Sequence, residues 1–431
     1  MMTRSSLKKK GSDILMSAVN TENMIVAVDI GTFKVCTIIA EIKNEEIDVI
    51  GIGVADNKGV TRGSISDIVE AANAIKKSVE KAEQMAGVKV EGVIASVSGK
   101  TISGITGHGM TSLSGSKQKL ITDIDVKKAL EVTKSIPFSE DREILHIKPI
   151  QFIVDSQDEI KNPVGMTGMK LEVDAYIVTG PITVIENITR VVELAGYKLV
   201  DVIVQPLATA KAVLYPDEKD IGVLMLDIGG GTTSIAVYLK NALRFVRIIP
   251  VGGEYITSDI AQGLHIPKAV AEEIKKKKGL VYTDDAREDD YFEVSDISGD
   301  KKEKIHRKEL VQFILPRVKE LLNFVETELR KEGIDKSMYA GGVVITGGTA
   351  LLNGIDRLIK EQFNTRVRIG LPLKERVVGL YDMVNSPEYV GAIGLIDFYL
   401  TEQVLTNDLL KTKGLLQKVL FYIKKFFSEF F

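Results

Sequence analysis

Short apolar runs separated by glycine-containing turns dominate the chain, and one arrangement of them occurs twice. The segments VAVDIGTFKVCTIIA (26–40) and LMLDIGGGTTSIAVY (224–238) each contain an apolar run, an aspartate, glycine with threonine, and a second apolar run. Runs of this length bounded by glycine favour buried strands. Each segment therefore predicts a β-hairpin with an aspartate near its turn, and the two hairpins lie in opposite halves of the chain.

The remaining pattern alternates between strands and helices, which is typical of an α/β protein. The first half predicts a helix from Asp67 to Ala86, the strand GVIASVSG, a helix from Ile182 to Ala195 and the strand LVDVIVQP. Between them, residues 104–181 predict a glycine-rich turn region (GITGHGMTSLSG), a helix begun by DIDVKKALEVTKS, and the strands HIKPIQFIVD and KLEVDAYIVT. The second half predicts a charged helical section at about 247–336, and then a strand, a turn and two helices at 341–400.

Composition narrows the class of protein. At 431 residues and 45% hydrophobic, the chain is long enough for two to four globular units. A net charge of -3 gives no global sign of nucleic-acid binding. Cys36 is the single cysteine, which excludes an internal disulfide framework and fits a reducing compartment. The four histidines have no ligand-type spacing, so we expect no structural zinc site.

The aspartate–glycine turns indicate a phosphate site. Backbone N–H groups at a tight turn can converge on an anion, and glycine lets the backbone approach closely. Thr32, Thr232 and Thr233 can add hydroxyl donors. Asp29 and Asp227 would repel a phosphate unless Mg²⁺, held largely through waters, lay between them. The alternative is a glycine turn whose aspartate side chain bonds its own backbone. The presence of two such hairpins favours instead a polyphosphate that is bound from both sides. The Walker A pattern GxxxxGK[ST] is absent from the sequence.

Two weaker signals support a nucleotide. In AGGVVITGGTALLNGI (340–355) a strand leads into Gly347, Gly348 and Thr349, and such a turn can accept a ribose, a base or a phosphate. Many α/β proteins use the same turn for packing alone. In AEEIKKKKG (271–279), Glu272 and Lys275 lie one helical turn apart and could contact a nucleoside together. A solvated charged helix face is the alternative.

In combination these segments resemble one superfamily. The order of the DIGT hairpin, VIVQPLATAKAVL, the DIGGGT hairpin, TGGTALLNG and YVGAIGLIDFYL is similar to the phosphate 1, connect 1, phosphate 2, adenosine and connect 2 motifs of actin-like ATPases. The resemblance implies a two-domain α/β fold with duplicated ribonuclease-H-like sheets, and ATP with Mg²⁺ between the domains.

The resemblance also assigns roles to residues. Those implied to bind the cofactor are Asp29, Gly31, Thr32, Lys34, Gly229, Gly230, Gly231, Thr232, Thr233, Glu272, Lys275, Gly347, Gly348 and Thr349. Asp29 and Asp227 would hold Mg²⁺, mostly through water. Gln205 would position the attacking water, with Asp227 as the second catalytic residue. Ser234 stands where an acidic residue is common in the superfamily. This difference leaves the expected ATP binding unchanged but argues against fast ATP hydrolysis.

Within the superfamily, the chain resembles the bacterial cell-division FtsA family. An extra lobe at 104–181 follows GVIASVSG, and VGGEYITSDIAQGLHIP and ILPRVKELLNFVETEL are similar to FtsA sequences. The implied division, in chain order, is a disordered N-terminal extension (1–23), a first core subdomain (24–103 and 182–205), the inserted lobe (104–181), a second core subdomain (206–246 and 337–400), a helical small lobe (247–336), a short linker (401–413) and a terminal helix (414–431).

The segment GLLQKVLFYIKKFFSEFF (414–431) predicts an amphipathic membrane-binding helix. Apolar residues recur at three- and four-residue steps, and lysines lie on the other side. The residues expected at the membrane are Leu416, Val419, Leu420, Ile423, Phe426, Phe427 and Phe430, with Lys418, Lys424 and Lys425. The stripe is too short to span a bilayer. A helix that completes the core is the alternative.

The sequence thus predicts an ATP-binding actin-like cell-division protein that polymerises at the inner face of the cytoplasmic membrane at the division site. By resemblance it would tether the FtsZ ring, be a weak ATPase at most, and contact other division proteins. Its 247–336 lobe would take the FtsZ C-terminal peptide, with Arg317 as a candidate partner for a peptide carboxylate. A pilus-assembly-type scaffold ATPase and a sugar or acid kinase of the same fold are the alternatives.

Overall fold

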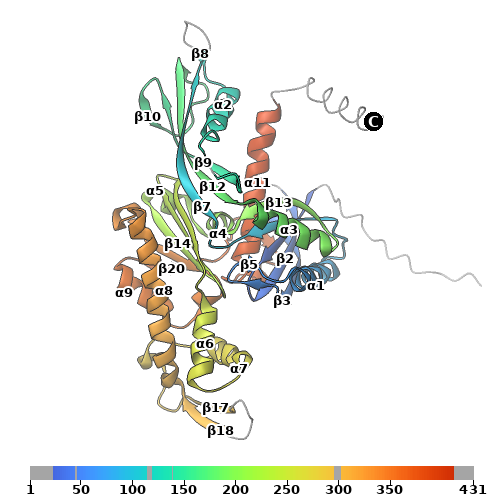
Figure 1. The fold of residues 1–431 in the computed structure, drawn as a ribbon, viewed down its shortest axis with the longest axis vertical. Coiled ribbons are helices and arrows are strands. Elements are labelled where there is room, and N and C mark those ends of the chain that lie inside the picture. Colours follow the sequence, from blue (N-terminus) through green and yellow to red (C-terminus); the bar gives the residue numbers. More distant parts are fainter. Residues whose placement is uncertain (1–22, 44–45, 114–118, 138, 296–301, 412–431) are drawn as a thin grey trace, which may run out of the picture.

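The structure is a computed structural model that describes residues 23–43, 46–113, 119–137, 139–295 and 302–411, with side chains up to residue 402. Two large sheets stand next to each other (Figure 1). A small lobe carrying α2 extends from one end of the molecule, and a second lobe carrying α6, α7 and a β-hairpin extends from the opposite end. The α/β architecture with two core units is as the sequence predicts.

The first sheet has six strands in the order β13-β6-β1-β2-β3-β21. Their bounds are β1 (Met24–Ile30), β2 (Lys34–Lys43), β3 (Glu46–Asp56), β6 (Gly92–Val97), β13 (Lys198–Val204) and β21 (Val377–Gly379). The helices α1 (Ile68–Ala86) and α3 (Ile182–Leu194) pack on it, and a small hairpin of β4 (Val60–Thr61) and β5 (Ser64–Ile65) precedes α1. The Asp67 carboxylate caps α1 by accepting the N–H groups of Val69 and Glu70.

The second sheet has nine strands in the order β10-β9-β12-β7-β16-β15-β14-β19-β20. Their bounds are β7 (Ser103–Ser112), β9 (Arg142–Val154), β10 (Gln157–Ile160), β12 (Lys170–Pro181), β14 (Val223–Ile228), β15 (Thr233–Leu239), β16 (Ala242–Ile249), β19 (Val343–Thr346) and β20 (Val367–Ile369). The strands of the inserted lobe continue the second sheet through one pairing, Arg247 with Ser103. The lobe also contains α2 (Asp123–Thr133), β8 (Lys119–Leu120) and β11 (Thr167–Gly168), and has a small core of its own.

The glycine-rich stretch GITGHGMTSLSG is not the turn region that the sequence predicts. Most of it lies in β7, which pairs with β12 in unbroken register from Ser103 to Ser112. Its glycines make room for neighbours rather than for a reversal of the chain. A Cβ at Gly109 would overlap the backbone of Ala129 in α2, and one at Gly107 would overlap the Ile136 and Ile177 side chains. Close packing against the strand, not turn chemistry, therefore explains the composition.

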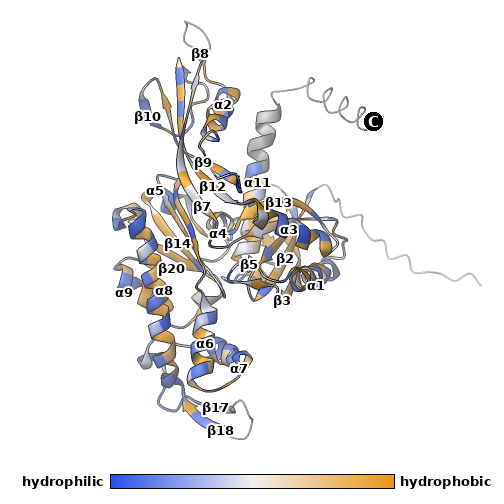
Figure 2. Ribbon diagram, viewed as in Figure 1, coloured by the Kyte–Doolittle hydropathy of each residue, from blue (hydrophilic) through white to orange (hydrophobic). Residues whose placement is uncertain are grey.

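The charged section at 247–336 forms the second small lobe. It contains α6 (Gly253–Gly263), α7 (Lys268–Lys278) and α8 (Val311–Lys331), and also a hairpin of β17 (Tyr291–Ser295) and β18 (Lys302–His306) that the helical prediction missed. Apolar residues from α6 and α8, such as Ile256, Ile260 and Val318, join one core with the second sheet and α9 (Ile355–Phe363). In Figure 2 the strands of both sheets are largely hydrophobic, whereas α7 is hydrophilic.

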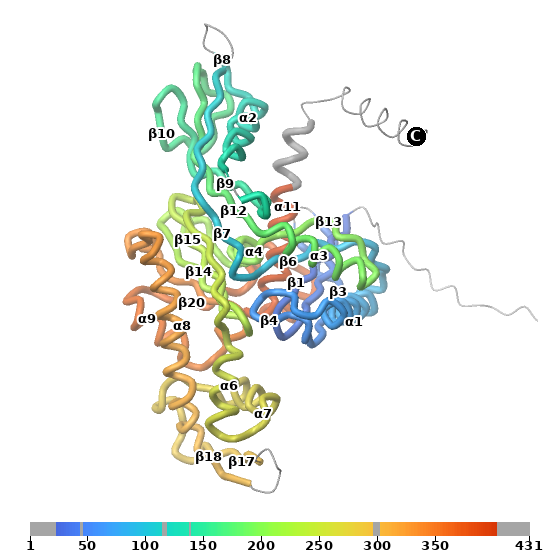
Figure 3. The backbone as a smooth tube through the Cα atoms, in the orientation of Figure 1, coloured from blue at the N-terminus to red at the C-terminus, as the bar shows by residue number. Residues whose placement is uncertain are grey.

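The last part of the chain returns to the first sheet. Strand β21 pairs with β3, and α11 (Val390–Lys411) packs on α4 (Gln205–Val213), where a Cβ at Gly394 would overlap the backbone of Ala208. Residues of α11, including Ile393 and Ile396, belong to the first core. Figure 3 shows this path, with the red end of the chain beside β1 and β6. Residues 377–400 therefore lie with the first sheet, and not in the second subdomain to which the sequence assigns 337–400.

The end of α11 also corrects the expected linker. The helix continues through Lys411, so most of 401–413 is helical. Residues 1–22 of the predicted extension (1–23) and the terminal segment 414–431 lie outside the described residues. Two short α-helices are α5 (Pro216–Ile221) and α10 (Tyr381–Val384), and short 3-10 helices lie at Thr283–Asp285, Arg307–Leu310, Lys336–Tyr339 and Gly348–Leu351. In the part of the chain that the structure describes, no helix has the length and apolar character needed to cross a bilayer.

Candidate functional site

A cavity of about 580 Å³ lies where the two aspartate–glycine hairpins face each other. The β1–β2 turn comes from the first sheet and the β14–β15 turn from the second. The turns touch, since a Cβ at Gly231 would overlap the Thr32 side chain and one at Gly230 would overlap the ring of Phe33. Glycine is thus required here by the close approach of the opposite turn.

The structure brings nearly all of the predicted cofactor and catalytic residues to this cavity. Its lining includes Asp29, Gly31, Thr32, Lys34, Gln205, Asp227, Gly229, Gly230, Gly231, Thr232, Glu272, Lys275, Gly347, Gly348 and Thr349. Thr233 is the exception. It is fully buried, and its hydroxyl donates to the backbone oxygen of Val251 at 2.8 Å. The prediction that this hydroxyl serves a bound anion is therefore corrected.

Asp227 is the penultimate residue of the buried strand β14, and its carboxylate is deeply buried. Its Oδ2 accepts hydrogen bonds from Gln205 Nε2 and from Thr209 Oγ1, the latter at 2.9 Å. The other oxygen faces Gly347, where a Cβ would overlap it. Burial raises the pKa of Asp227 to about 6, and the nearby charge of Asp29 adds to the rise.

Asp29 occupies the matching position near the end of β1. Burial also raises the pKa of Asp29, although a hydrogen bond with Ser96 and the charge of Lys34 oppose the rise. Its carboxylate lies against Gly391 in the first turn of α11, where a Cβ would overlap Oδ2. Each aspartate is therefore packed against a glycine that a later part of the chain supplies.

These two carboxylates fit a hard cation. No group of three or more His, Cys, Asp or Glu side chains that could hold a metal occurs among the described residues. The chain thus offers Mg²⁺ few direct ligands, and Mg²⁺ commonly completes its shell with waters and ligand phosphates. Burial raises the pKa of both aspartates, and a divalent cation beside them would favour their ionised forms.

Gln205 begins α4 and points at Asp227. Its Nε2 also lies 3.2 Å from Thr209 Oγ1, and its Oε1 accepts the Ser234 hydroxyl at 2.7 Å. Ser234 therefore orients the glutamine amide. Ser234 places a neutral hydroxyl in the cavity wall, and this hydroxyl contacts Gln205.

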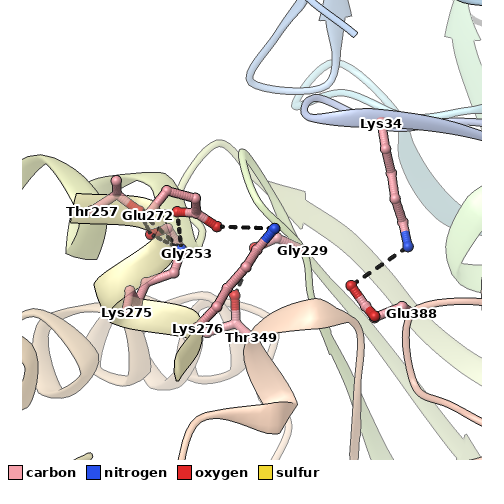
Figure 4. Close-up of polar contacts among 9 residues, drawn as sticks. All are labelled: Lys34, Gly229, Gly253, Thr257, Glu272, Lys275, Lys276, Thr349 and Glu388. Carbon is pink, nitrogen blue, oxygen red and sulfur yellow. Dashed lines mark hydrogen bonds and ion pairs between the residues drawn. The ribbon is translucent and has the colours of Figure 1, made fainter. Parts of the chain in front are cut away.

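Glu272 and Lys275 meet at the edge of the cavity, as their helical spacing predicts (Figure 4). They form an ion pair at 2.7 Å. Lys275 Nζ also donates to Gly253 O at 3.0 Å and to Thr257 Oγ1 at 2.9 Å, and the Thr257 hydroxyl bonds Glu272. This network ties α7 to α6. Close by, Thr349 Oγ1 donates to Gly229 O at 3.0 Å, which joins the two glycine turns of the second core.

Sequence reasoning missed the segment before α11. Glu388 and Tyr389 line the cavity, and Glu388 Oε1 lies 3.6 Å from Lys34 Nζ (Figure 4). Lys34 also lies over the Tyr389 ring, 4.8 Å from its centroid. The sequence YVGAIGL, which begins at Tyr389, indicated only a helix. No pattern singled out Glu388, and none gave Tyr389 a place at the cavity.

Arg317 is not at the cavity. It lies on α8, where its guanidinium bonds both oxygens of Asp259 at 2.6 and 3.0 Å and also pairs with Glu320. It lies over the Tyr255 ring, and Arg62 from the first half of the chain lies over the same ring. The guanidinium is thus already engaged by carboxylates of its own lobe.

Comparison with known proteins gives a consistent result. The family model for cell division protein FtsA matches residues 224–394, and that for the SHS2 domain inserted in FtsA matches residues 99–179. Cell division protein FtsA of Bacillus subtilis (strain 168) is 38% identical over 88% of this chain and 84% of its own length. FtsA of Escherichia coli (strain K12) is 34% identical over 87% of this chain and 90% of its own length.

Solved structures support the fold. A PilM–PilN type IV pilus biogenesis complex matches with a TM-score of 0.61 at 16% identity, over 86% of this chain and 97% of that one. MreB5 of Spiroplasma citri, bound to ADP, matches with a TM-score of 0.52 at 16% identity, over 89% and 98%. The predicted actin-like fold is confirmed.

The pKa of Asp227 predicts a pH dependence of stability. A carboxyl with a higher pKa in the folded state binds more protons when folded, so stability should fall as pH rises from about 4 to about 6. Asp227→Asn removes the charge and should raise the free energy of unfolding at about pH 7 by about 1–3 kcal/mol, with little effect below about pH 4. Urea denaturation of the protein without added ligand measures both.

Asp397→Asn is the matched control. Asp397 is equally buried but forms an ion pair with Arg376 at 2.7 Å, so this variant should lose stability. A loss of stability at neutral pH in both variants would show that the Asp227 carboxylate is already compensated in the fold.

Proposed function

The chain belongs to the FtsA family of cell-division proteins, and on that basis we propose that it binds ATP with Mg²⁺ between its two sheets. It is an actin-like protein of cell division. One observation carries the nucleotide proposal. Two glycine turns, each following a buried aspartate, face each other across one cavity of about 580 Å³. A polyphosphate with a divalent cation has the charge and the length that this arrangement accommodates.

The cavity supplies different groups along its length. Backbone N–H groups at Gly230–Thr232, with the Thr32 hydroxyl, would hold phosphates, and Lys34 adds a cation. The N–H groups of Gly31 and Gly229 donate to Lys34 O and Thr232 O and so shape the two turns. Gly347–Thr349 and the pair of Glu272 with Lys275 lie where the nucleoside would be. When bound, Mg²⁺ neutralises phosphate charge, and Asp29 and Asp227 would hold it largely through waters.

Hydrolysis, if it occurs, would be slow. Gln205 is the residue we assign to water positioning, with Asp227 beside it. The Gln205 amide is bonded to Asp227, Thr209 and Ser234, so it must release a partner to orient a water. A neutral hydroxyl at Ser234 provides no additional base. This fits a protein in which the nucleotide controls assembly more than it is turned over.

We further propose that the protein polymerises and joins the FtsZ ring to the membrane. Self-association and FtsZ binding follow from family membership, with the FtsZ C-terminal peptide docking on the 247–336 lobe and other division proteins as further partners. A peptide carboxylate could reach Arg317 by replacing Glu320, whose side chain is the more exposed of its two partners.

Membrane attachment is assigned to residues 414–431, at the inner face of the cytoplasmic membrane. Burying one large apolar side chain is worth roughly 1.5–3 kcal/mol. With seven such residues at half depth, the gross gain is about 5–10 kcal/mol before ordering costs. Lys418, Lys424 and Lys425 can each add about 1 kcal/mol against an anionic leaflet. Polymerisation would multiply this reversible binding through avidity.

The alternatives have less support. The likeness to the pilus complex is at 16% identity and concerns the fold alone, whereas the FtsA relatives share 34–38% identity over most of the chain. A kinase would need an aspartate in the cavity that acts as general base toward the substrate, and the sequence contains no kinase-type substrate motif. Pelleting with liposomes with and without ATP, followed by electron microscopy for membrane-bound filaments, tests the whole proposal.

The first test concerns nucleotide. Asp29→Asn and Asp227→Asn should each weaken binding of ATP with Mg²⁺ by about 10- to 100-fold, as expected when a group that holds a metal through its waters is lost. Titration calorimetry measures this. Gln205→Ala should keep the affinity and slow any hydrolysis. Unchanged ATP affinity in both aspartate variants would refute the assigned site.

The second test concerns the membrane. Removal of residues 414–431 should abolish sedimentation with anionic liposomes while ATP binding persists. Phe427→Glu should do nearly as much, because it places a charge in the middle of the apolar face, and Lys424→Glu should weaken binding mainly to anionic lipid. If the truncated protein sediments like the full chain, another part of the protein is the anchor.

The third test concerns the FtsZ peptide. Arg317→Ala should weaken peptide binding by about tenfold, as for the loss of a charge-assisted bidentate bond. Glu320→Gln should strengthen it, because one competing carboxylate is removed. Fluorescence anisotropy with a labelled peptide measures both. Wild-type affinity in Arg317→Ala would exclude this arginine from the docking site while leaving the lobe to be mapped by other variants.

A further inference from the structure

Glu388 places a carboxylate in the wall of a cavity that would receive a polyanion. It precedes α11, and its Oε1 lies 3.6 Å from Lys34 Nζ on the opposite side of the cavity. Both side chains are about one-third exposed, at 35% and 30%. Figure 4 shows the two pointing toward each other from different parts of the fold.

Glu388 also reaches toward the second core. A Cβ at Gly348 would lie 3.7 Å from Glu388 Oε1, so the carboxylate stands between the phosphate-side lysine and the turn assigned to the nucleoside. Among the described residues, Lys34 is the one cation within ion-pair distance of Glu388. The carboxylate is therefore balanced by a residue that phosphates would also use.

We propose that Glu388 is an affinity-determining residue that competes with nucleotide phosphates for Lys34. This inference rests on the proposed nucleotide site. With the cavity empty, the Glu388 carboxylate holds Lys34. When a polyphosphate forms an ion pair with Lys34, it replaces Glu388. The Glu388 carboxylate then has no counter-ion and remains near the negative charge of the ligand. The Glu388 carboxylate therefore repels the bound phosphates. This repulsion weakens binding more as the negative charge of the ligand increases.

The geometry favours exchange over a permanent bond. A separation of 3.6 Å is longer than a charge-assisted hydrogen bond, and partly exposed ion pairs contribute little to stability. Lys34 also rests on the Tyr389 ring, which can keep its ammonium in the cavity after Glu388 is displaced. The lysine is thus positioned for a phosphate while its counter-ion is easily released.

Glu388→Gln tests the idea because it keeps the shape and removes the charge. It should tighten ATP binding by about two- to fivefold, with a smaller gain for ADP and none for adenosine, and added salt should reduce the gain. Glu326→Gln is the control, since Glu326 forms an ion pair of similar length, 3.4 Å to Arg330, on α8 outside the cavity lining. Calorimetry with the full chain, Mg²⁺ and each ligand measures the affinities.

The outcomes separate this inference from the function it rests on. If wild-type protein binds ATP and Glu388→Gln binds it equally well, the competition is refuted and the nucleotide site stands. If Glu388→Gln weakens ATP and adenosine alike, Glu388 accepts a ribose hydroxyl and the proposal is wrong. If neither wild type nor variant binds ATP, the proposed function fails. In a Lys34→Gln background the gain should shrink, because the contested cation is gone.

Discussion

The burial of two carboxylates at one junction is the constraint on which the rest of this structure depends. Asp29 and Asp227 each lie near the end of a central strand, and burial raises the pKa of both. Ionised groups in such positions are costly without a counter-charge. The fold tolerates them by donating hydrogen bonds to each and by leaving a cavity between them. A site that is unfavourable when empty is well suited to a ligand that brings its own cation.

The same junction connects the distant parts of the molecule. Gly391, which contacts the Asp29 carboxylate, opens α11, and this helix continues to Lys411 beside the inserted lobe. Lys148 in β9 pairs with Glu402 at 2.5 Å and lies over Phe398 in α11. Helix α11 therefore contacts both the cavity and the inserted lobe. On the other side, Arg62 of the first half and Arg317 of the helical lobe both lie over the Tyr255 ring.

Packing in this molecule repeatedly uses glycine where backbone meets a side chain or another backbone. Glycines at 347 and 391 face the two aspartates, and Gly394 lets α11 approach α4. In β7, Gly107 and Gly109 let α2 and its neighbours lie against the sheet. Gly347 and Gly391 belong to the site, whereas Gly107 and Gly109 belong to the lobe. Glycine content alone cannot distinguish them, because both arise from the absence of a Cβ.

The sequence by itself determined the local pieces of this protein. Hydrophobic period and turn chemistry predict the two aspartate–glycine hairpins and the strand before Gly347. Helical spacing places Glu272 and Lys275 one turn apart on the same helix face. All of these patterns act over a few residues. Tertiary structure alone decided which pieces meet. The glycine-rich stretch pairs with β12 and forms β7, and residues 377–400 pack with the first sheet. The Thr233 hydroxyl donates to a backbone oxygen, and Glu388 forms an ion pair with Lys34. These outcomes depend on contacts between residues far apart in the chain, which no short pattern records.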